Sequence, residues 1–180
     1  MILCLIILKL PVWLLLYHDD ILKIRILTVG KLKEKYLVSG IKEYEKRLNG
    51  YCKVEMVEVL DEPIPDNASP LVEDNIKNKE AKKLVEKIKK DDYVIVLDLH
   101  GQQIDSVELS KRIESCMLHG KSTIDFVIGG SLGLGEDIIE RADFRLCFSQ
   151  MTFPHQLMKL ILMEQIYRSF KIMKNETYHK

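Results

Sequence analysis

The sequence predicts a single-domain α/β protein built on a largely parallel sheet. Apolar runs of strand length alternate with segments of helical periodicity along most of the chain. The run 93–99 is apolar almost throughout, as in strands that are covered on both faces. With 180 residues, 47% of them hydrophobic and 30% charged, the chain is long enough for one compact core. Alternating strands and helices of this kind favour parallel pairing.

Each element has its own signal. Strands are expected at 23–29, 53–60, 93–99, 124–128 and 145–148. Helices are expected at 34–48, 71–88, 105–119, 136–141 and 154–173. The helix 34–48 has Leu37, Ile41 and Leu48 on one face, and Asp105 and Glu108 have the spacing of a capping box. Three prolines predict a loop at 61–70.

Residues 1–21 form an apolar extension that differs from the rest of the chain. Three interpretations compete: a membrane anchor, an extra strand or helix, and upstream sequence translated from a misplaced start. Lys9 and Pro11 interrupt the apolar run, which is slightly short of the roughly twenty residues of a membrane helix. Residues 22–30 already make a good first strand, and a leucine at 22 is what an internal TTG start codon would encode. We therefore expect a domain at 22–180, preceded by a misplaced start or a disordered segment.

Charge and cysteine usage exclude some classes of protein. The net charge is zero, but the ends of the domain are basic and its middle is acidic. Basic ends could meet a polyanion without the very high isoelectric point of free nucleic-acid binders, although solvated helix faces would look the same. The four cysteines are far apart and lack zinc-ligand spacing, so we expect reduced core residues and no metal site.

The most informative motif follows the expected strand 124–128. Four glycines, Gly129, Gly130, Gly133 and Gly135, occur within seven residues, which lets main chain approach a ligand closely. A P-loop would need Lys-Ser/Thr after its last glycine, whereas Gly135 is followed by two acidic residues. A dinucleotide fingerprint would need a third glycine at position 138, which is isoleucine. The motif therefore indicates a backbone-built pocket for a cofactor without phosphates.

Three expected strand ends are candidates to form that pocket: 97–101, 128–130 and 148–153. Ligands in parallel sheets bind at the carboxyl ends of the strands. If these ends are adjacent, they form a slot lined by Leu97, Leu132, Met151 and Phe153. Such a slot suits adenine and a thioether better than a charged tail. From composition alone, ordinary core packing is the preferred explanation for Leu97, Met151 and Phe153.

Several stretches together resemble a known family. They are Leu27-Thr-Val-Gly-Lys-Leu-Lys-Glu-Lys-Tyr36, Glu43-Tyr-Glu-Lys-Arg47, Phe126-Val-Ile-Gly-Gly130, Phe148-Ser-Gln-Met-Thr-Phe-Pro-His-Gln156, Glu164-Gln-Ile-Tyr-Arg168 and Tyr178-His-Lys180. The combination resembles the small single-domain SPOUT (α/β-knot) methyltransferases that methylate N3 of a pseudouridine in 23S ribosomal RNA. The resemblance covers residues 22–180. It implies a C-terminal trefoil knot, a homodimer, S-adenosyl-L-methionine as cofactor, 23S ribosomal RNA in the assembled ribosome as partner, and a cytoplasmic location.

The resemblance also implies site residues. Cofactor contacts fall on Leu97, Gly129, Phe148, Ser149, Gln150, Met151, Thr152 and Phe153. Because a uracil-type N3 carries a proton at neutral pH, a base or a positive charge must help it leave. The catalytic candidates are His155, Arg168, Tyr178 and His179. A capping role for His155 and a salt bridge for Arg168 are open alternatives, whereas the resemblance places the tail at the active site.

Partners and alternative functions follow from the same residues. Phosphate contacts are expected from basic side chains at both ends of the domain: Lys31, Lys33, Lys35, Arg168, Lys171, Lys174 and Lys180. A SPOUT methyltransferase acting on tRNA would keep the cofactor pocket and change only the target. A non-catalytic ribosome-associated protein would keep the fold without turnover. A membrane-tethered protein is the weakest alternative.

Overall fold

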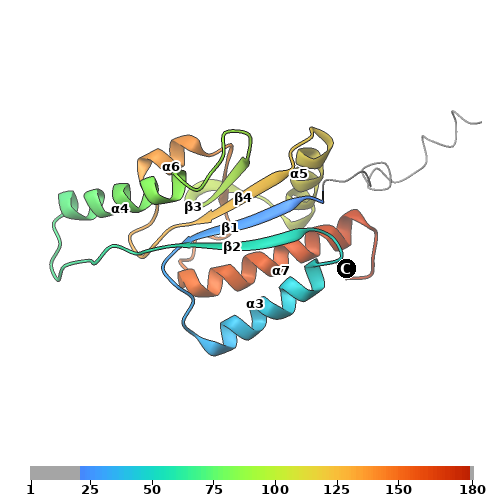
Figure 1. Cartoon of the computed structure of the whole chain (residues 1–180), viewed down its shortest axis with the longest axis horizontal. Helices are drawn as coiled ribbons and strands as arrows, with labels where there is room; N and C mark the ends of the chain where they lie inside the picture. Colours follow the sequence, from blue (N-terminus) through green and yellow to red (C-terminus); the bar gives the residue numbers. More distant parts are fainter. Residues whose placement is uncertain (1–20, 179–180) are drawn as a thin grey trace, which may run out of the picture.

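The computed structural model describes residues 21–178 and contains the expected succession of strands and helices (Figure 1). The strands are β1 Lys23–Val29, β2 Lys53–Val59, β3 Tyr93–Gln103, β4 Thr123–Ile128 and β5 Phe144–Cys147. The helices are α3 Lys35–Leu48, α4 Pro70–Val85, α5 Ser106–Leu118, α6 Glu136–Arg141 and α7 His155–Met173. Element boundaries differ from the expected ones by a few residues, and β3 continues beyond Leu99. The interpretations of the apolar extension 1–21 concern residues that, apart from Ile21, lie outside the described residues.

The five strands form one sheet in the order β2-β1-β4-β3-β5, with every neighbouring pair parallel. This confirms the predicted fold class. All carboxyl ends therefore lie at one edge of the sheet, on the left in Figure 1. Within residues 21–178, no helix is sufficiently long and apolar to cross a membrane.

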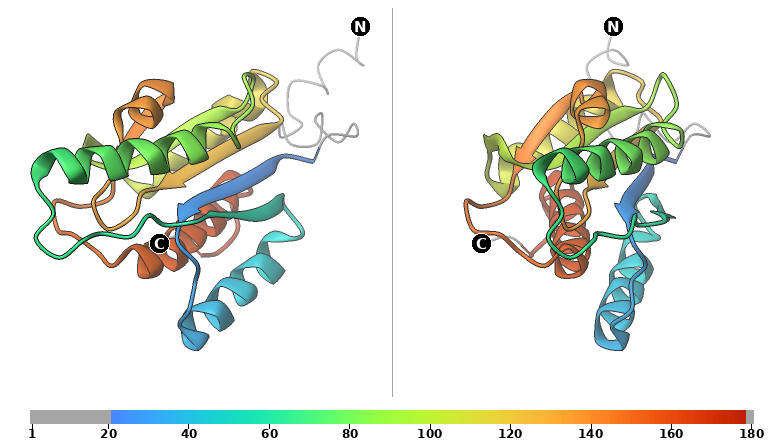
Figure 2. Two further views of the ribbon diagram at one scale, coloured as in Figure 1. Left: turned by 60° about the vertical axis from the view of Figure 1, so that its left-hand side comes forward. Right: turned by 90° about the vertical axis from the view of Figure 1, so that its left-hand side faces the viewer.

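Helices cover both faces of the sheet (Figure 2). Along β1, Ile24 and Ile26 belong to the core under α3, α5 and α7, whereas Leu27 and Val29 belong to the core under α4 and α6. Such a strand is buried on both sides, which explains its apolar composition. Each fully buried large side chain contributes roughly 1.5–3 kcal/mol of transfer free energy, so the two cores hold the three layers together.

Strand β3 pairs with β5 through two separate parts. Leu146 of β5 pairs with Leu97 and also with Gln102, because the register of β3 shifts between these two residues. The turn that joins the two parts of β3 passes so close to β5 that a Cβ on Gly101 would lie 2.5 Å from the carbonyl oxygen of Arg145. Enclosure of β5 by an earlier segment is consistent with a threaded chain. The complete trefoil knot stays a prediction.

A charged pair is buried near the amino ends of the strands. Arg25 of β1 and Asp125 of β4 are cross-strand partners, with 3.3 Å between the Arg25 Nε and the Asp125 Oδ1. The Asp125 side chain is fully buried, and its two carboxyl oxygens have no hydrogen-bond partner among the described residues. Burial raises the pKa of Asp125 to about 7, although Arg25 opposes the shift. The stability of the sheet should therefore depend on pH.

Candidate active site

The glycine-rich segment forms a tight turn directly after β4. The Gly133 N–H donates to the Gly130 carbonyl oxygen at 3.1 Å, and Gly133 has a φ of +94°, which favours glycine. A Cβ on Gly129 would lie only 2.6 Å from the carbonyl oxygen of Gly133. Backbone thus packs against backbone here, and the turn brings main-chain groups to the carboxyl edge of the sheet.

The predicted cofactor residues come together beside this turn. Gly129 follows β4, Leu97 lies on β3, and residues 148–153 follow β5, and these three strands are neighbours in the sheet. Leu97, Phe148 and Phe153 are partly buried against the same core. Met151 is 69% exposed, so core packing does not explain it. The ends of these strands are therefore neighbours, as expected, whereas Leu132 lines a hollow at the ends of β1 and β4; the slot and its cofactor contacts stay predictions.

The loop after β5 is ordered by its own short-range hydrogen bonds. The Met151 N–H donates to Ser149 Oγ at 3.0 Å, and the Cys147 thiol donates to the Ser149 carbonyl at 3.3 Å. The Gln150 amide donates to the Cys147 sulfur at 3.6 Å. No side chain in 148–153 carries a charge. This donor and acceptor set suits a neutral purine and a thioether-like chain, and it offers nothing that would recognise a phosphate.

A small hollow lies beside the glycine turn, at the ends of β1 and β4. Its volume is about 70 Å³, and its lining consists of Val29, Gly30, Asp61, Glu62, Ile64, Glu80, Gly130, Ser131, Leu132 and His155. Burial lowers the pKa of His155, the nearby Lys159 ammonium lowers it further, and Asp61 opposes them. The imidazole is therefore neutral at neutral pH and able to accept a proton.

Sequence reasoning missed two buried charged residues in this region. Glu80 is 5% exposed, accepts the Glu62 N–H at 2.9 Å, and has a pKa that burial raises. Lys159 is fully buried on α7, one turn after His155. The only signal for Lys159 was a single lysine within the apolar run 157–163. Such a residue normally points to solvent, because burying an ammonium is costly.

Arg168 and Tyr178 form a separate cluster with Glu164. The Tyr178 hydroxyl donates to Glu164 Oε1 at 3.1 Å, and the Arg168 guanidinium pairs with Glu164 and lies 4.8 Å from the centre of the Tyr178 ring. Burial raises the pKa of Tyr178, and so do its hydrogen bonds with Tyr44 and Glu164. The phenol therefore stays protonated at neutral pH and is a hydrogen-bond donor.

This cluster is far from His155 within one chain. Arg168 follows His155 by thirteen residues on the same helix, which is roughly 20 Å at a rise of about 1.5 Å per residue. The fold of a single chain thus brings His155 to the hollow beside the glycine turn but leaves Arg168 and Tyr178 further along α7. His179 lies outside the described residues.

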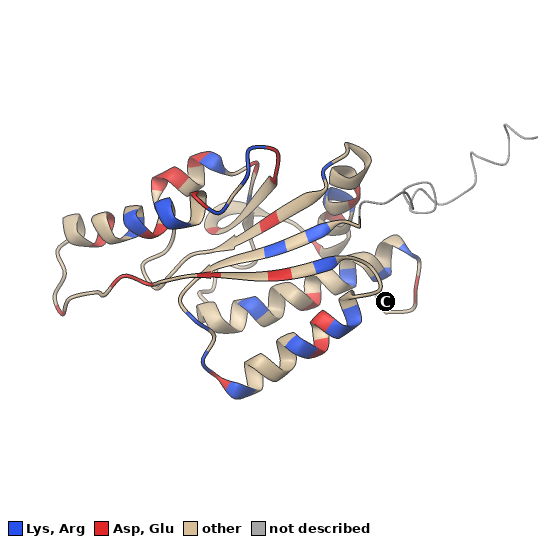
Figure 3. Cartoon of the chain, in the orientation of Figure 1, with Lys and Arg blue, Asp and Glu red and all other residues tan. Residues whose placement is uncertain are grey.

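The predicted phosphate contacts divide in the same way. Lys31, Lys33 and Lys35 are exposed between β1 and the start of α3 (Figure 3). Lys171 pairs with Glu176, and the Lys174 ammonium lies 4.4 Å from the centre of the Tyr51 ring. Lys180 lies outside the described residues. The basic groups of the first set therefore face solvent beside His155, and those of the second lie near the Tyr178 cluster.

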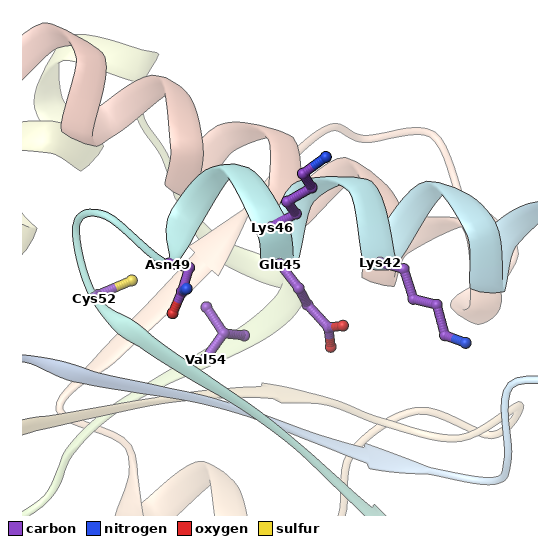
Figure 4. A pocket seen from close by; sticks show the side chains of 6 residues that line it. All are labelled: Lys42, Glu45, Lys46, Asn49, Cys52 and Val54. Carbon is purple, nitrogen blue, oxygen red and sulfur yellow. The ribbon is translucent and has the colours of Figure 1, made fainter.

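A larger hollow of about 560 Å³ lies away from the glycine turn, between α3 and the edge strand β2 (Figure 4). Lys42, Glu45, Lys46, Asn49, Cys52 and Val54 line it. Burial raises the pKa of Cys52 to about 12, so its thiol is not a nucleophile at neutral pH. Despite its smaller volume, the hollow beside His155 is the better candidate for a site, because it contains a side chain that can accept a proton at neutral pH.

Metal chemistry receives no support from the described part of the chain. Within residues 21–178, no group of three or more His, Cys, Asp or Glu side chains is placed to hold a metal ion. Cys52, Cys116 and Cys147 are buried and free.

Comparisons with known proteins agree with the geometry. The family described as "Predicted SPOUT methyltransferase" matches residues 22–179. The chain is 57% identical over 159 residues to "Ribosomal RNA large subunit methyltransferase H 1" of Clostridium perfringens (strain SM101 / Type A), which covers 88% of this chain and 100% of the relative. Proteins named "Ribosomal RNA large subunit methyltransferase H" from Ruminiclostridium cellulolyticum and Acetivibrio thermocellus are 54% and 52% identical with the same coverage. The chain belongs to the SPOUT methyltransferase family.

Proposed function

We propose that this protein transfers a methyl group from S-adenosyl-L-methionine to N3 of a pseudouridine in 23S ribosomal RNA, on the assembled ribosome in the cytoplasm. The observation that carries the proposal is the identity of 52–57% over the full length of relatives that are named as large-subunit ribosomal RNA methyltransferases.

The cofactor slot fits this donor. Its residues would be Leu97, Gly129 and the loop 148–153, which together offer apolar surface and backbone groups without charge. A Cβ at Gly129 would press on the turn that forms one wall of the slot. S-adenosyl-L-methionine bound there supplies an electrophilic methyl group. The residues around it must then align the acceptor nitrogen and remove its proton.

His155 is the best-suited proton acceptor among the candidates. Its neutral imidazole lies beside the glycine turn, at the start of α7. Arg168 and Tyr178 are donors at neutral pH, because their interactions raise both of their pKa values. Such donors would stabilise negative charge that develops on the base as N3 loses its proton.

We further propose that the site is completed in a homodimer. About 20 Å of helix separates Arg168 from His155, so one chain does not bring these groups to the same substrate. Leu157 and Ile161 of α7 remain partly exposed, which supports packing against a second copy. The second copy would supply Arg168, Tyr178 and His179 to the slot of the first.

Nucleoside mass spectrometry tests the reaction. The protein is incubated with methyl-labelled S-adenosyl-L-methionine and with assembled ribosomes, isolated large subunits, naked 23S RNA or tRNA. We expect N3-methylpseudouridine, formed chiefly on assembled ribosomes. Label in tRNA would favour the tRNA-modifying alternative. Cofactor binding without turnover on any RNA would favour a non-catalytic ribosome-associated protein.

Complementation tests the homodimer. His155→Ala and Arg168→Ala are prepared separately, and the two proteins are then unfolded, mixed and refolded together. If the site is composite, mixed dimers contain one site with neither substitution and recover part of the activity. Two inactive variants that stay inactive after mixing would refute the composite site.

A further inference from the structure

Three side chains hold the backbone of the segment that follows β1. The Leu32 N–H donates to Glu58 Oε1 at 2.9 Å, and the Lys33 N–H donates to Gln156 Oε1 at 3.0 Å. The Lys159 ammonium donates to the Gly30 carbonyl at 3.1 Å. Gly30 has a φ of +76°, so the chain turns sharply here. A short surface segment, 30–33, is thus fixed by hydrogen bonds from β2 and α7.

Lys159 is the unusual member of this set. Its side chain is fully buried, and its Nζ lies 3.5 Å from Glu58 Oε1. Burial lowers the pKa of Lys159, while Glu58 acts in the opposite direction. A methionine would fill similar space without the cost of burying a charge. The ammonium contacts the Gly30 carbonyl and the Glu58 carboxylate, and Glu58 also accepts the Leu32 N–H. Its interactions therefore hold the backbone of the segment 30–33 in one conformation.

The segment 30–33 carries exposed lysines. Lys31 and Lys33 point from it into solvent, and Lys35 follows at the start of α3. Figure 3 shows blue segments in the connection that leaves the carboxyl end of β1 and leads to α3. The charges of these lysines will attract phosphates whether or not the backbone is fixed. A fixed backbone adds a defined spacing between them.

We propose that Lys159 is a positioning residue for RNA binding: together with Glu58 and Gln156, it holds residues 30–33 so that Lys31 and Lys33 meet RNA phosphates in a preset arrangement. The proposal rests on the proposed function insofar as RNA is the partner. A segment that is ordered before binding loses less conformational entropy when the complex forms. Lys159 therefore acts on affinity for RNA, through the backbone that it holds.

The first test is the variant Lys159→Met, assayed at a pH above 8 so that His155 is neutral in both proteins. Without the Lys159 ammonium, the backbone of residues 30–33 must be ordered when RNA binds. If this costs the conformational entropy of roughly one residue, KM for ribosomes rises by about tenfold. We expect kcat at saturating ribosomes and the dissociation constant of S-adenosyl-L-methionine to stay within about twofold of wild type. Lys159→Arg, which restores a charged donor, should recover most of the loss.

Two further variants separate positioning from general destabilisation. Gln156→Ala removes a partly exposed partner of the segment and leaves the buried charge in place, so it remains informative if Lys159→Met does not fold. It should also raise KM for ribosomes. Ser110→Ala removes a buried hydrogen bond of 3.0 Å to the Ser169 carbonyl, near the other end of α7. This control should lower stability without changing KM.

Amide hydrogen exchange measures how well the backbone of segment 30–33 is held in the absence of RNA. In Lys159→Met and Gln156→Ala, the amides of Leu32 and Lys33 should exchange faster than in wild type and in Ser110→Ala. Unchanged exchange, or an unchanged KM in folded Gln156→Ala, would overturn the positioning role while the proposed function stood. A wild-type protein that methylates no ribosomal RNA would instead remove the proposed function. Faster exchange together with weaker binding of isolated large subunits would then still support the role of Lys159.

Discussion

Gly129→Ala should disable methyl transfer while the protein remains folded. The added Cβ would lie 2.6 Å from the Gly133 oxygen and 2.8 Å from its carbon, whereas ordinary contacts begin at 3.4 Å. The obstructing atoms are backbone, so either the glycine turn or the end of β4 must move by about 0.8 Å. A misplacement of about 1 Å in a site that aligns two reacting atoms costs on the order of a hundredfold in rate. We therefore expect kcat to fall by about that factor, which corresponds to roughly 2.7 kcal/mol of activation free energy.

The assay combines single-turnover methyl transfer with calorimetric titration of S-adenosyl-L-methionine and a thermal melt. Overpacking should also cost about 1–3 kcal/mol of unfolding free energy, which a folded domain can tolerate. Gly50→Ala is the matched control, because a Cβ there meets nothing within 4 Å. If folded Gly129→Ala kept both its rate and its cofactor affinity within about twofold of wild type, the close approach at Gly129 would have no role in the site.

Three other predictions concern pH and packing. Because burial raises the pKa of Asp125 to about 7, the stabilisation that this carboxyl provides below pH 4 should be lost as the pH rises to 7, at up to about 1.4 kcal/mol per pH unit. Urea denaturation at several pH values in this range gives the unfolding free energy, which should vary less with pH for Asp125→Asn than for wild type. An equal pH dependence in the two proteins would contradict the assignment. The lowered pKa of His155 places the acidic limb of the kcat/KM profile below its ordinary value of 6.5. His155→Gln should abolish that limb and lower the rate by about 10²–10⁴-fold, and a persisting limb would assign the base elsewhere. Gly101→Ala should lower the free energy of unfolding by about 1–3 kcal/mol, since the added Cβ would lie 2.5 Å from the Arg145 backbone. Gly40→Ala meets only a flexible leucine side chain and should be nearly neutral, so equal losses in the two variants would refute this distinction.

The succession of elements was predictable because it depends on local patterns. The capping box of Asp105 and Glu108 is confirmed, with both of its hydrogen bonds formed. The gathering of Leu97, Gly129 and 148–153 was predictable too, since parallel strands end at the same edge. The insertion of β4 between β1 and β3 depends on long-range pairing, which leaves no local signal.

The site was predictable only in part, for two physical reasons. Resemblance placed the tail at the active site, but the length of α7 separates Arg168 from His155 within one chain. The burial of Lys159 depends on Gly30 and Glu58, which are more than a hundred positions away in the sequence. A lysine in an apolar helix is ordinarily expected to reach solvent. Tertiary contacts decide the burial of Lys159, whereas the separation of Arg168 from His155 follows from the helix expected at 154–173.

The enclosure of β5 by β3 bears on how the molecule responds to force. A four-residue strand at the end of a sheet would ordinarily detach when one ladder breaks. Because Leu146 pairs with both Leu97 and Gln102, β5 leaves the sheet only after its pairing with both parts of β3 is lost. A pull on the end of α7 should therefore have to break both sets of pairs before it releases the strand. Loop 148–153 thus starts from a short strand that two parts of β3 hold in place.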